Sequence, residues 1–413
     1  MRQIPEVVLG KIATITMGTS PKGENYNSEG NGMPLLNGPT EFGLIHPACT
    51  LFTTDSKKEC KKDDLIFCVR GSTTGRMNWA DKQYSLGRGV CSIRGATPMD
   101  TKYIRYCIEL KLGALLKLSG GATFPNLTGN DLSTFSIPYP PHRYKIAAIL
   151  SAYDDLIENN MRRIRILEEM AQILYREWFV KFRFPGHEKV RMVESELGMV
   201  PEGWEVKKLG DVVTLHRGKS YRTPDLVDEG GIPFLNLKCI ERGGGFRYDG
   251  VKRFQGEYKP TQTAKTGDII VAVTDMTQER RLVAHAARVH IIGNDFAVMS
   301  MDLVKIEPNT EVSKDYLHGV LRFSDFSQEV RQHANGVNVL HLNPSQIQEF
   351  KFALPPTELR NLYAELCASA YQECDVLHAK NANLRRTRDL LLPKLISGEV
   401  DVEKIEIRMS DRR

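Results

Sequence analysis

Six polar turns, three in each half of the chain, combine arginine or lysine with hydroxyl and amide side chains. In complexes with DNA, arginine pairs with guanine edges and asparagine or glutamine with adenine, while lysine, serine and threonine hold phosphates. The turns are therefore candidate DNA contacts, and the alternative is that they are solvated loops. The candidates in the first half are Thr19, Ser20, Lys22, Arg70, Ser72, Thr73, Thr74, Arg76, Thr123 and Asn126. Those in the second half are Arg217, Lys219, Ser220, Tyr221, Arg222, Thr274, Asp275, Gln278, Arg280, Arg281, Asn335, Asn338 and His341.

Motifs that would carry catalysis are incomplete. "NPSQ" at 343–346 lacks the second proline of the Asn-Pro-Pro-aromatic motif of adenine methyltransferases. "GKS" at 218–220 has the end of a phosphate-binding loop, but Val213 stands where that loop needs glycine. "PDL" at 224 and "EYK" at 257 are only weakly similar to a nuclease motif. We therefore expect no catalytic residue and no metal ligand in this chain.

The chain repeats itself, which explains why the polar turns come in matching sets. "LGKIATITMG" at 9–18 matches "LGDVVTLHRG" at 209–218, and "MPLLN" at 33–37 matches "IPFLN" at 232–236. Segment 61–76 matches 265–280, and 121–141 matches 336–356. The repeat predicts two similar lobes, in which the turns occupy equivalent places.

Each lobe mixes strand and helix patterns. The runs "DLIFCV" and "DIIVAV" have the length of buried strands, and the alternating segments before Gly18 and Gly218 are typical of strands that lead into turns. A helical pattern covers 101–120. The sequence predicts α+β lobes, each with a twisted and partly antiparallel sheet.

A long helix follows each lobe. No glycine or proline interrupts the chain from Pro141 to Phe182, and apolar residues recur there in steps of four and three, which predicts a helix roughly 60 Å long. The first seam is Ile146, Leu150, Tyr153, Ile157, Asn160, Ile164, Leu167, Ala171, Leu174 and Trp178. The second is Tyr363, Cys367, Ala370, Cys374, Leu377, Asn381, Leu384, Arg388, Leu391 and Leu395, and Pro393 must bend or end that helix.

An apolar seam is not stable alone in water, so we expect the two helices to pack on each other as an antiparallel coiled coil. Head-to-tail pairing of the seams places Asn160 level with Asn381. A buried asparagine pair would set register and orientation. The alternative is that both asparagines are solvated where the helices splay apart. Two lobes on such a pair would form a pseudo-two-fold reader of two separate DNA sites.

Composition agrees with this interpretation but does not require it. The net charge is +5 and the pI is about 8.6, which is compatible with nucleic-acid binding. The eight cysteines form no CxxC and are expected to be reduced and buried. No apolar run is long enough to span a membrane and the start lacks a signal pattern, so we expect a cytoplasmic protein.

The whole set of motifs resembles the specificity subunit of a type I restriction–modification enzyme. The phrases that carry the resemblance include "LGDVVTLHRG", "KTGDIIV", "PPHRYKIAAILSAYDDLIENNMRRIRILEEMAQILYREWFVKFRFPG", "ESELGMVPEGWEVKKLGDV" and "LRRTRDLLLPKLISGEVDV", in the family's order. The resemblance implies a first target recognition domain at 1–141, a central helical region at 142–184, a linker and second recognition domain at 185–356, and a distal helical region and tail at 357–413.

The resemblance also implies an asymmetric bipartite DNA target and no active site in this chain. The partners that it implies are two methyltransferase (modification) subunits and restriction subunits that translocate and cut DNA. S-adenosylmethionine, ATP and magnesium would be bound by those partners, so this chain would bind no cofactor.

An aromatic cluster, "YREWFVKFRFPG", ends the first long helix. Trp178 and Phe179, with Leu395 in the second repeat, are candidates for an exposed partner anchor, because aromatic residues dominate binding energy at interfaces. The alternative is that they close the junction between helix and lobe. Two rival functions also stay open: a self-sufficient nuclease or methyltransferase component, and a coiled-coil adaptor without DNA specificity.

Overall fold

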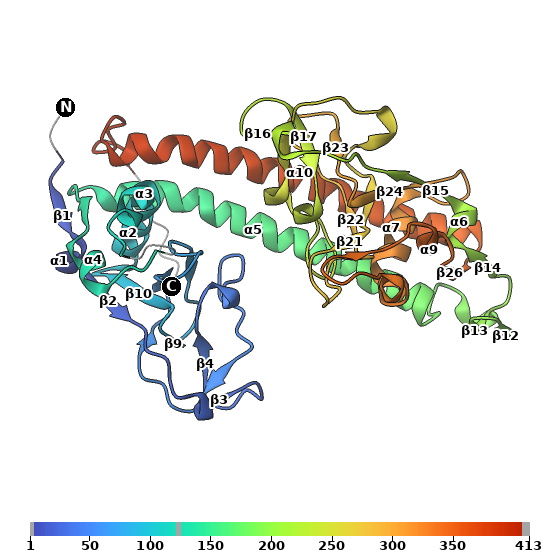
Figure 1. Ribbon diagram of the computed structural model, residues 1–413, viewed down its shortest axis with the longest axis horizontal. Coiled ribbons are helices and arrows are strands. Elements are labelled where there is room, and N and C mark those ends of the chain that lie inside the picture. The colour runs from blue at the N-terminus through green and yellow to red at the C-terminus, as the bar shows by residue number, and fades with distance from the viewer. Residues whose placement is uncertain (1–3, 121–124, 407–413) are drawn as a thin grey trace. The chain divides into compact units, whose positions relative to one another are not determined.

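The structure is a computed structural model that describes residues 4–120 and 125–406. The described chain forms two compact units (Figure 1). The first contains the residues up to Asn159 together with those from Asn383 on, and the second is Asn160–Ala382. Each unit holds one lobe and a part of each long helix, so the chain contributes to the first unit from both of its ends.

A four-stranded antiparallel sheet forms the centre of the first lobe. Its order is β2 (Ala13–Met17), β10 (Val90–Gly95), β7 (Leu65–Cys68) and β8 (Met77–Trp79). A five-stranded sheet contains β3 (Tyr26–Asn27), β5 (Phe52–Thr53), β4 (Met33–Leu36), β9 (Tyr84–Leu86) and β6 (Glu59–Cys60), and β1 (Glu6–Val8) pairs with β11 (Ser136–Pro138). The helices are α1 (Leu9–Ile12), α2 (Pro98–Leu110), α3 (Leu112–Leu116) and α4 (Gly129–Thr134).

The second lobe repeats this topology. Its four-stranded sheet is β15 (Val213–Arg217), β24 (Leu303–Pro308), β20 (Ile269–Ala272) and β22 (Ala286–Arg288). Its five-stranded sheet is β16 (Leu226–Val227), β18 (Lys252–Phe254), β17 (Ile232–Leu235), β23 (Ala297–Met299) and β19 (Thr263–Ala264). The shorter pairs are β12 (Met192–Ser195) with β13 (Gly198–Pro201), β14 (Glu205–Lys208) with β26 (Lys351–Leu354), and β21 (Thr274–Asp275) with β25 (Leu340–His341). The helices are α6 (Leu209–Val212), α7 (Lys314–Phe323), α8 (Phe326–Val330) and α9 (Ser345–Gln348).

The two lobes match in detail, as the repeat predicts. Each five-stranded sheet contains one parallel pair, β4 with β9 in the first lobe and β17 with β23 in the second. The matched Leu9 and Leu209 are both fully buried, and their backbone N–H groups donate to Phe135 and Phe350 at 2.9 and 2.7 Å. The prediction of two similar α+β lobes is therefore confirmed.

The long helices are α5 (Arg143–Tyr175) and α10 (Thr357–Ile396). The sequence predicts that the first helix continues to about Phe182, but a π-helical turn replaces its last part at Arg176–Val180. The wider turn places Trp178 and its neighbour Phe179 in one core, each only 8% exposed. Pro393 does not stop α10, which continues for three more residues.

Within the first unit, α5 and α10 are joined around Asp154. Its carboxylate accepts hydrogen bonds from Arg105 at 2.8 Å and Tyr106 at 2.5 Å on α2, and it also pairs with Arg388 on α10. Leu150 shares a hydrophobic cluster with Leu392 and Leu395. Since residues early in α5 meet residues late in α10, the two segments run antiparallel here.

The same direction holds within the second unit. Asn160 and Asn381 are buried, and the Asn160 Nδ2 donates to the Asn381 Oδ1 at 2.9 Å. At the other end of the contact, the Tyr363 hydroxyl donates to the Ala171 carbonyl at 3.3 Å. A coiled-coil geometry for the whole helix pair, with the asparagines as its register device, stays a prediction.

Asp375 on α10 connects that helix to the second lobe through hydrogen bonds. Its carboxylate receives two bonds from the Arg288 guanidinium, at 2.7 and 2.8 Å, and lies 3.1 Å from the His290 Nδ1. Burial alone would raise the pKa of Asp375, but the bonds from His290 and Arg288 outweigh burial and hold the pKa at about 2.

Replacing Asn381 by leucine should lower the free energy of unfolding by about 1–3 kcal/mol, because Asn160 then keeps a buried amide without its partner. The double variant Asn160→Leu/Asn381→Leu should recover most of this loss, since no polar group is left unpaired. Urea unfolding followed by tryptophan fluorescence measures both. Glu373→Gln, which weakens the exposed pair with Arg163, is the control and should change stability by less than about 1 kcal/mol. Equal losses in single and double variants would contradict a paired amide.

Asp375→Asn should remove about 2 kcal/mol of stability at pH 7, because the folded state holds the carboxylate's pKa at about 2, below an unfolded value of about 3.9. A lowered pKa stabilises the fold above the unfolded value, and this stabilisation is lost as pH falls from about 4 to about 2. The wild type should therefore lose more stability than the variant over this window in urea unfolding. Parallel curves would show that the carboxylate is not held in its charged form.

Candidate nucleic-acid interface

One end of the central sheet of the first lobe brings three chain segments together. The Gly18 N–H donates to the Val90 carbonyl at 3.0 Å, and the Val69 N–H donates to the Gly89 carbonyl at 2.9 Å. The Leu127 N–H then donates to the Val69 carbonyl at 2.9 Å. The predicted turns that follow Gly18, follow Val69 and precede Leu127 therefore meet at the same sheet end, although they are far apart in sequence.

The second lobe has the same three bonds at equivalent positions. Gly218 donates to Leu303 at 3.1 Å, Val273 to Asp302 at 2.8 Å, and Leu342 to Val273 at 2.8 Å. All of these are backbone groups, so the arrangement does not depend on which side chains the turns carry. We call the three turns of each lobe its loop end.

The glycine that opens the first turn is required by this close approach. A Cβ atom at Gly18 would lie 2.1 Å from the Gly87 carbonyl oxygen, and one at Gly218 would lie 2.0 Å from the Ser300 carbonyl oxygen. These distances are too short for any side chain. The matched glycines noted in the sequence thus hold the first turn against the neighbouring turn of each loop end.

In the first loop end, backbone contacts hold the turns and leave most of the candidate side chains exposed. Arg70 forms an isolated β-bridge with Asn126. The Thr74 hydroxyl donates to the carbonyls of Gly71 at 2.8 Å and Pro125 at 3.1 Å, so Thr74 ties the second turn to the third. Half-buried Thr73 lies 3.8 Å from the Cys68 sulfur. The exposed candidates are Thr19, Lys22, Arg70, Ser72, Arg76 and Asn126; Thr123 lies outside the described residues.

In the second loop end, Asp275 and Thr274 have structural positions. Asp275 is 1% exposed, and its carboxylate accepts hydrogen bonds from the backbone of Thr277, Leu282 and Val283. Burial would raise the pKa of Asp275, but these bonds lower it below its usual value. Thr274 is 5% exposed. The burial of both side chains contradicts the prediction that they contact DNA, and Asp275 instead holds the turn together.

Two other candidates brace the turns against each other. The Gln278 Nε2 donates to the carbonyls of Gly336 at 3.2 Å and Val337 at 2.8 Å, and the Arg280 Nη2 donates to the Ala334 carbonyl at 3.4 Å. Exposed Arg281 pairs with Glu279 at 2.8 Å, and the exposed Asn335 amide donates to the His333 carbonyl at 3.0 Å.

The remaining candidates of the second lobe differ in exposure. Tyr221 packs its ring on Phe234, with centroids 4.7 Å apart, and burial raises its pKa. The Lys219 N–H donates to the Met299 carbonyl at 2.7 Å, which anchors its backbone. Exposed side chains without such packing are Arg217, Ser220, Arg222, Asn338 and His341.

Arg88 is a cation at the first loop end that the sequence interpretation missed. It is exposed, and its backbone N–H donates to the Ser20 hydroxyl at 3.2 Å, so it lies beside a candidate turn. The loop end of the second lobe exposes apolar side chains in addition to its cations, with Met276 at 63%, Met301 at 39% and Val337 at 92%. The one sequence signal that could have indicated Arg88 is the pair of glycines on both sides of it, Gly87 and Gly89.

The predicted partner anchor is wrong, because its residues are buried within their own units. Trp178 and Phe179 belong to the core of the second unit, where Phe179 packs on Tyr316 and Tyr363. Leu395 is 2% exposed in the core of the first unit. The aromatic cluster thus closes the junction between helix and lobe, which is the alternative that the sequence left open.

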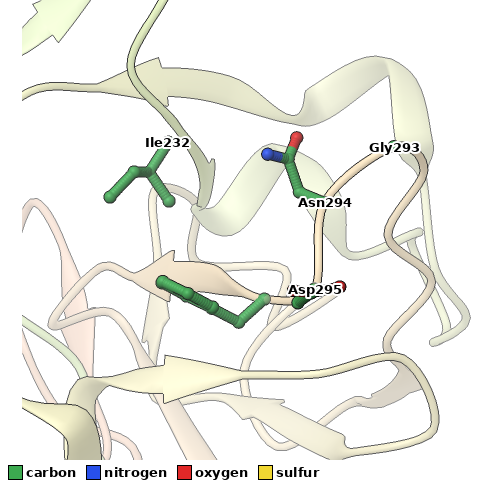
Figure 2. A pocket seen from close by; sticks show the side chains of 5 residues that line it. Ile232, Gly293, Asn294 and Asp295 are labelled. Atoms are coloured by element: carbon green, nitrogen blue, oxygen red, sulfur yellow. The ribbon is translucent and has the colours of Figure 1, made fainter.

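A cavity in the second lobe lacks the side chains that a catalytic or metal site would need. Ile232, Gly293, Asn294, Asp295 and Phe296 line a cavity of about 520 Å³ (Figure 2). Asp295 is the one charged group in that lining, without a histidine or cysteine beside it. Across the described ranges, no group of three or more histidine, cysteine or acidic side chains is placed to hold a metal ion. No helix of the described chain is both long enough and apolar enough to cross a membrane.

Comparison with known proteins places both lobes in one family. The family model described as the type I restriction modification DNA specificity domain matches residues 3–169 and again residues 201–365. The MjaIX specificity subunit of a type I restriction enzyme from Methanocaldococcus jannaschii is 30% identical over 371 residues, which are 86% of this chain and 82% of that protein. The MjaVIII specificity subunit of the same organism is 24% identical over 352 residues, 83% and 80% of the two chains.

A solved structure shows the same fold. The S subunit of a type I restriction–modification system from M. genitalium superposes with a TM-score of 0.57 at 18% identity, over 96% of this chain and 97% of that one. With two family domains, each containing one loop end, the chain belongs to the specificity subunits of type I restriction–modification systems.

Proposed function

We propose that this chain selects the DNA sequence for a type I restriction–modification complex, and that each loop end reads one half of an asymmetric, two-part target. The observation that carries the proposal is the shared backbone frame. Both lobes bring three turns to the same end of the central sheet through equivalent hydrogen bonds. The side chains on the frames differ, so the two halves of the target would differ in sequence.

The exposed cations and amides divide into two kinds of contact. Lys22, Arg76, Arg217 and Arg222 are exposed at the loop ends and are suited to phosphates, which position the protein without reading sequence. Asn126 and Asn338 are exposed amides of the third turns, and an amide can form two bonds with an adenine edge. Each loop end thus has groups for positioning and for reading.

The long helices would set the spacing between the two half-sites. α5 contains 33 residues, a length of about 50 Å, which exceeds one DNA turn of about 34 Å. A spacing that depends on helix length leaves the DNA between the half-sites unread. The target would then consist of two short sequences separated by a fixed number of unspecified base pairs.

The partners would be two methyltransferase subunits and restriction subunits. Those partners would bind S-adenosylmethionine, ATP and magnesium, while this chain would bind no cofactor.

An exposed apolar stripe on the helices is a better docking surface than the aromatic cluster, which is buried. On α5 it contains Ile166, Met170 and Ile173, which are 49%, 59% and 61% exposed. On α10 of the same unit, Leu362 and Leu366 are 41% and 50% exposed. Apolar side chains at helical spacing on a surface are typical of protein interfaces.

In cells that carry the complete system, methylated adenines should map to one asymmetric two-part motif.

Asn338→Ala should relax base preference in one half of that motif only, by about 1–3 kcal/mol at one position, because an exposed amide of the second loop end is lost. Arg222→Ala should weaken binding to all sequences alike and reduce the salt dependence of binding by about one ion, as expected for a phosphate contact. Long-read methylation mapping and titration of the complex with duplex DNA measure these effects. Methylation without a fixed motif would contradict the proposed function.

The double variant Met170→Glu/Ile173→Glu should prevent association with the methyltransferase subunits, because two charges replace apolar contacts of the stripe. Its thermal unfolding should stay close to that of the wild type, since both side chains are exposed. Co-purification from cells that express all subunits measures association. Arg165→Glu adds the same charge to α5 one residue from Ile166, on a different side of the helix, and should leave assembly intact. Normal assembly of the double variant would place the docking surface elsewhere.

A further inference from the structure

The turn 87–89 of the first lobe occupies the middle of the loop end. It connects β9 to β10, the strand that lies between β2 and β7 in the central sheet. Its backbone bonds reach neighbouring segments on several sides: the Gly87 N–H donates to the Leu36 carbonyl at 2.8 Å, and the Gly89 carbonyl accepts from Val69 at 2.9 Å. The second turn is thereby attached to this short connection, and the first turn is attached to it through the Arg88 N–H, which donates to the Ser20 hydroxyl at 3.2 Å.

Steric limits on both sides leave Arg88 as the one side chain of this turn. A Cβ atom at Gly87 would lie 2.3 Å from the Asn37 Oδ1, and one at Gly89 would lie 2.2 Å from the Asn37 carbonyl oxygen. Neither position accepts another residue without movement of the backbone. The turn is thus packed against Asn37 before and after Arg88, while Arg88 itself is exposed.

The Arg88 guanidinium forms no ion pair within the part of the chain that the structure describes. Its backbone N–H is held by the Ser20 hydroxyl at 3.2 Å, but within residues 4–120 and 125–406 no carboxylate forms an ion pair with its side chain. The other arginine near β10, Arg94, is by contrast held by Asp64 through bonds of 2.5 and 2.6 Å. A free guanidinium on a fixed backbone is prepared for an external ligand, since little backbone entropy is lost when the ligand binds.

We propose that Arg88 reads a guanine in the half-site of the first lobe. The guanidinium presents paired N–H donors that match O6 and N7 of guanine in the major groove, and this pairing is the commonest specific contact between proteins and DNA. This inference rests on the proposed function and identifies a base and the residue that selects it.

The second lobe provides a natural comparison at the matching turn, Ser300 to Asp302. The Asp302 carbonyl accepts from Val273 at 2.8 Å, as the Gly89 carbonyl accepts from Val69 in the first lobe. The Met301 N–H donates to the Lys219 backbone carbonyl at 2.8 Å, whereas the Arg88 N–H donates to the Ser20 hydroxyl, so both tips are held to the first turn by different acceptors. The side chain at the tip is a partly exposed methionine, which cannot donate hydrogen bonds to a base. The guanine contact therefore belongs to the first half-site alone, and Met301 is suited to an apolar contact such as a thymine methyl group.

Methylation mapping with the complete complex tests the inference. Arg88→Ala should relax the preference for guanine at one position by about tenfold or more, and only in the half-site that Asn338→Ala leaves unchanged. Arg88→Lys keeps the charge but loses the fork of donors, so it should also relax that position while the salt dependence of binding stays like that of the wild type. Met301→Ala is the matched control and should leave the guanine position intact.

The outcomes separate this inference from the proposed function. If the complex with Arg88→Ala methylates the wild-type motif and still discriminates guanine from the other bases as before, Arg88 does not read a base. The chain would then still select DNA. If Arg88→Lys keeps full discrimination while Arg88→Ala only weakens binding to all sequences, Arg88 contacts a phosphate and the inference is overturned. A wild-type complex that methylates without any motif would contradict the proposed function itself.

Discussion

The loop ends depend on one constraint, which is that buried backbone N–H and C=O groups must find hydrogen-bond partners. At the end of each central sheet, strand pairing stops, and the residues that follow β7 and β20, Val69 and Val273, bond instead to the turn before β10 or β24 and to the segment after the third turn. Three turns are thereby attached to one another by atoms that every residue type carries. The side chains at the tips are left free to differ, and this allows one frame to serve two lobes with different chemistry.

Half-buried carboxylates have a second role where each lobe meets the long helices. Asp154 receives Arg105, Tyr106 and Arg388 in the first unit, and Asp375 receives Arg288 and His290 in the second. Apolar contacts alone would tolerate sliding by a helical turn, because leucine and isoleucine fit many neighbours. A half-buried carboxylate with several directed partners favours one position, because a shift would break its hydrogen bonds. These aspartates therefore specify where the helix lies against its lobe, and removal of one partner costs stability because the other charge is left unpaired.

The sequence contains most of the fold and only part of the site. The repeat, the apolar runs of β7 and β20 and the helix seams are local patterns, so two α+β lobes and two long helices could be predicted from them. The burial of Asp275 could not, because its donors Leu282 and Val283 are seven and eight residues away and the turn must fold before they meet. The sequence left open whether Trp178 and Phe179 form an exposed anchor or close a junction, because their burial depends on Tyr316 and Tyr363, which are more than 130 residues away in the chain. Arg88 has no local pattern beyond its glycines, whose reason is the distant Asn37.

The frame consists of backbone bonds and the proposed reading groups are exposed tips, so the proposed function separates specificity from stability in this molecule. A substitution at an exposed position such as Arg88 or Asn338 removes no buried contact and should change stability little. A substitution at Gly18 or Gly218, by contrast, would push the turns apart and disturb every contact of that loop end together. The number of base pairs between the half-sites would depend on the helices and not on the tips. Under the proposed function, new target sequences would arise by changes at a few exposed side chains, without changes to the sheets, the long helices or the proposed docking surface.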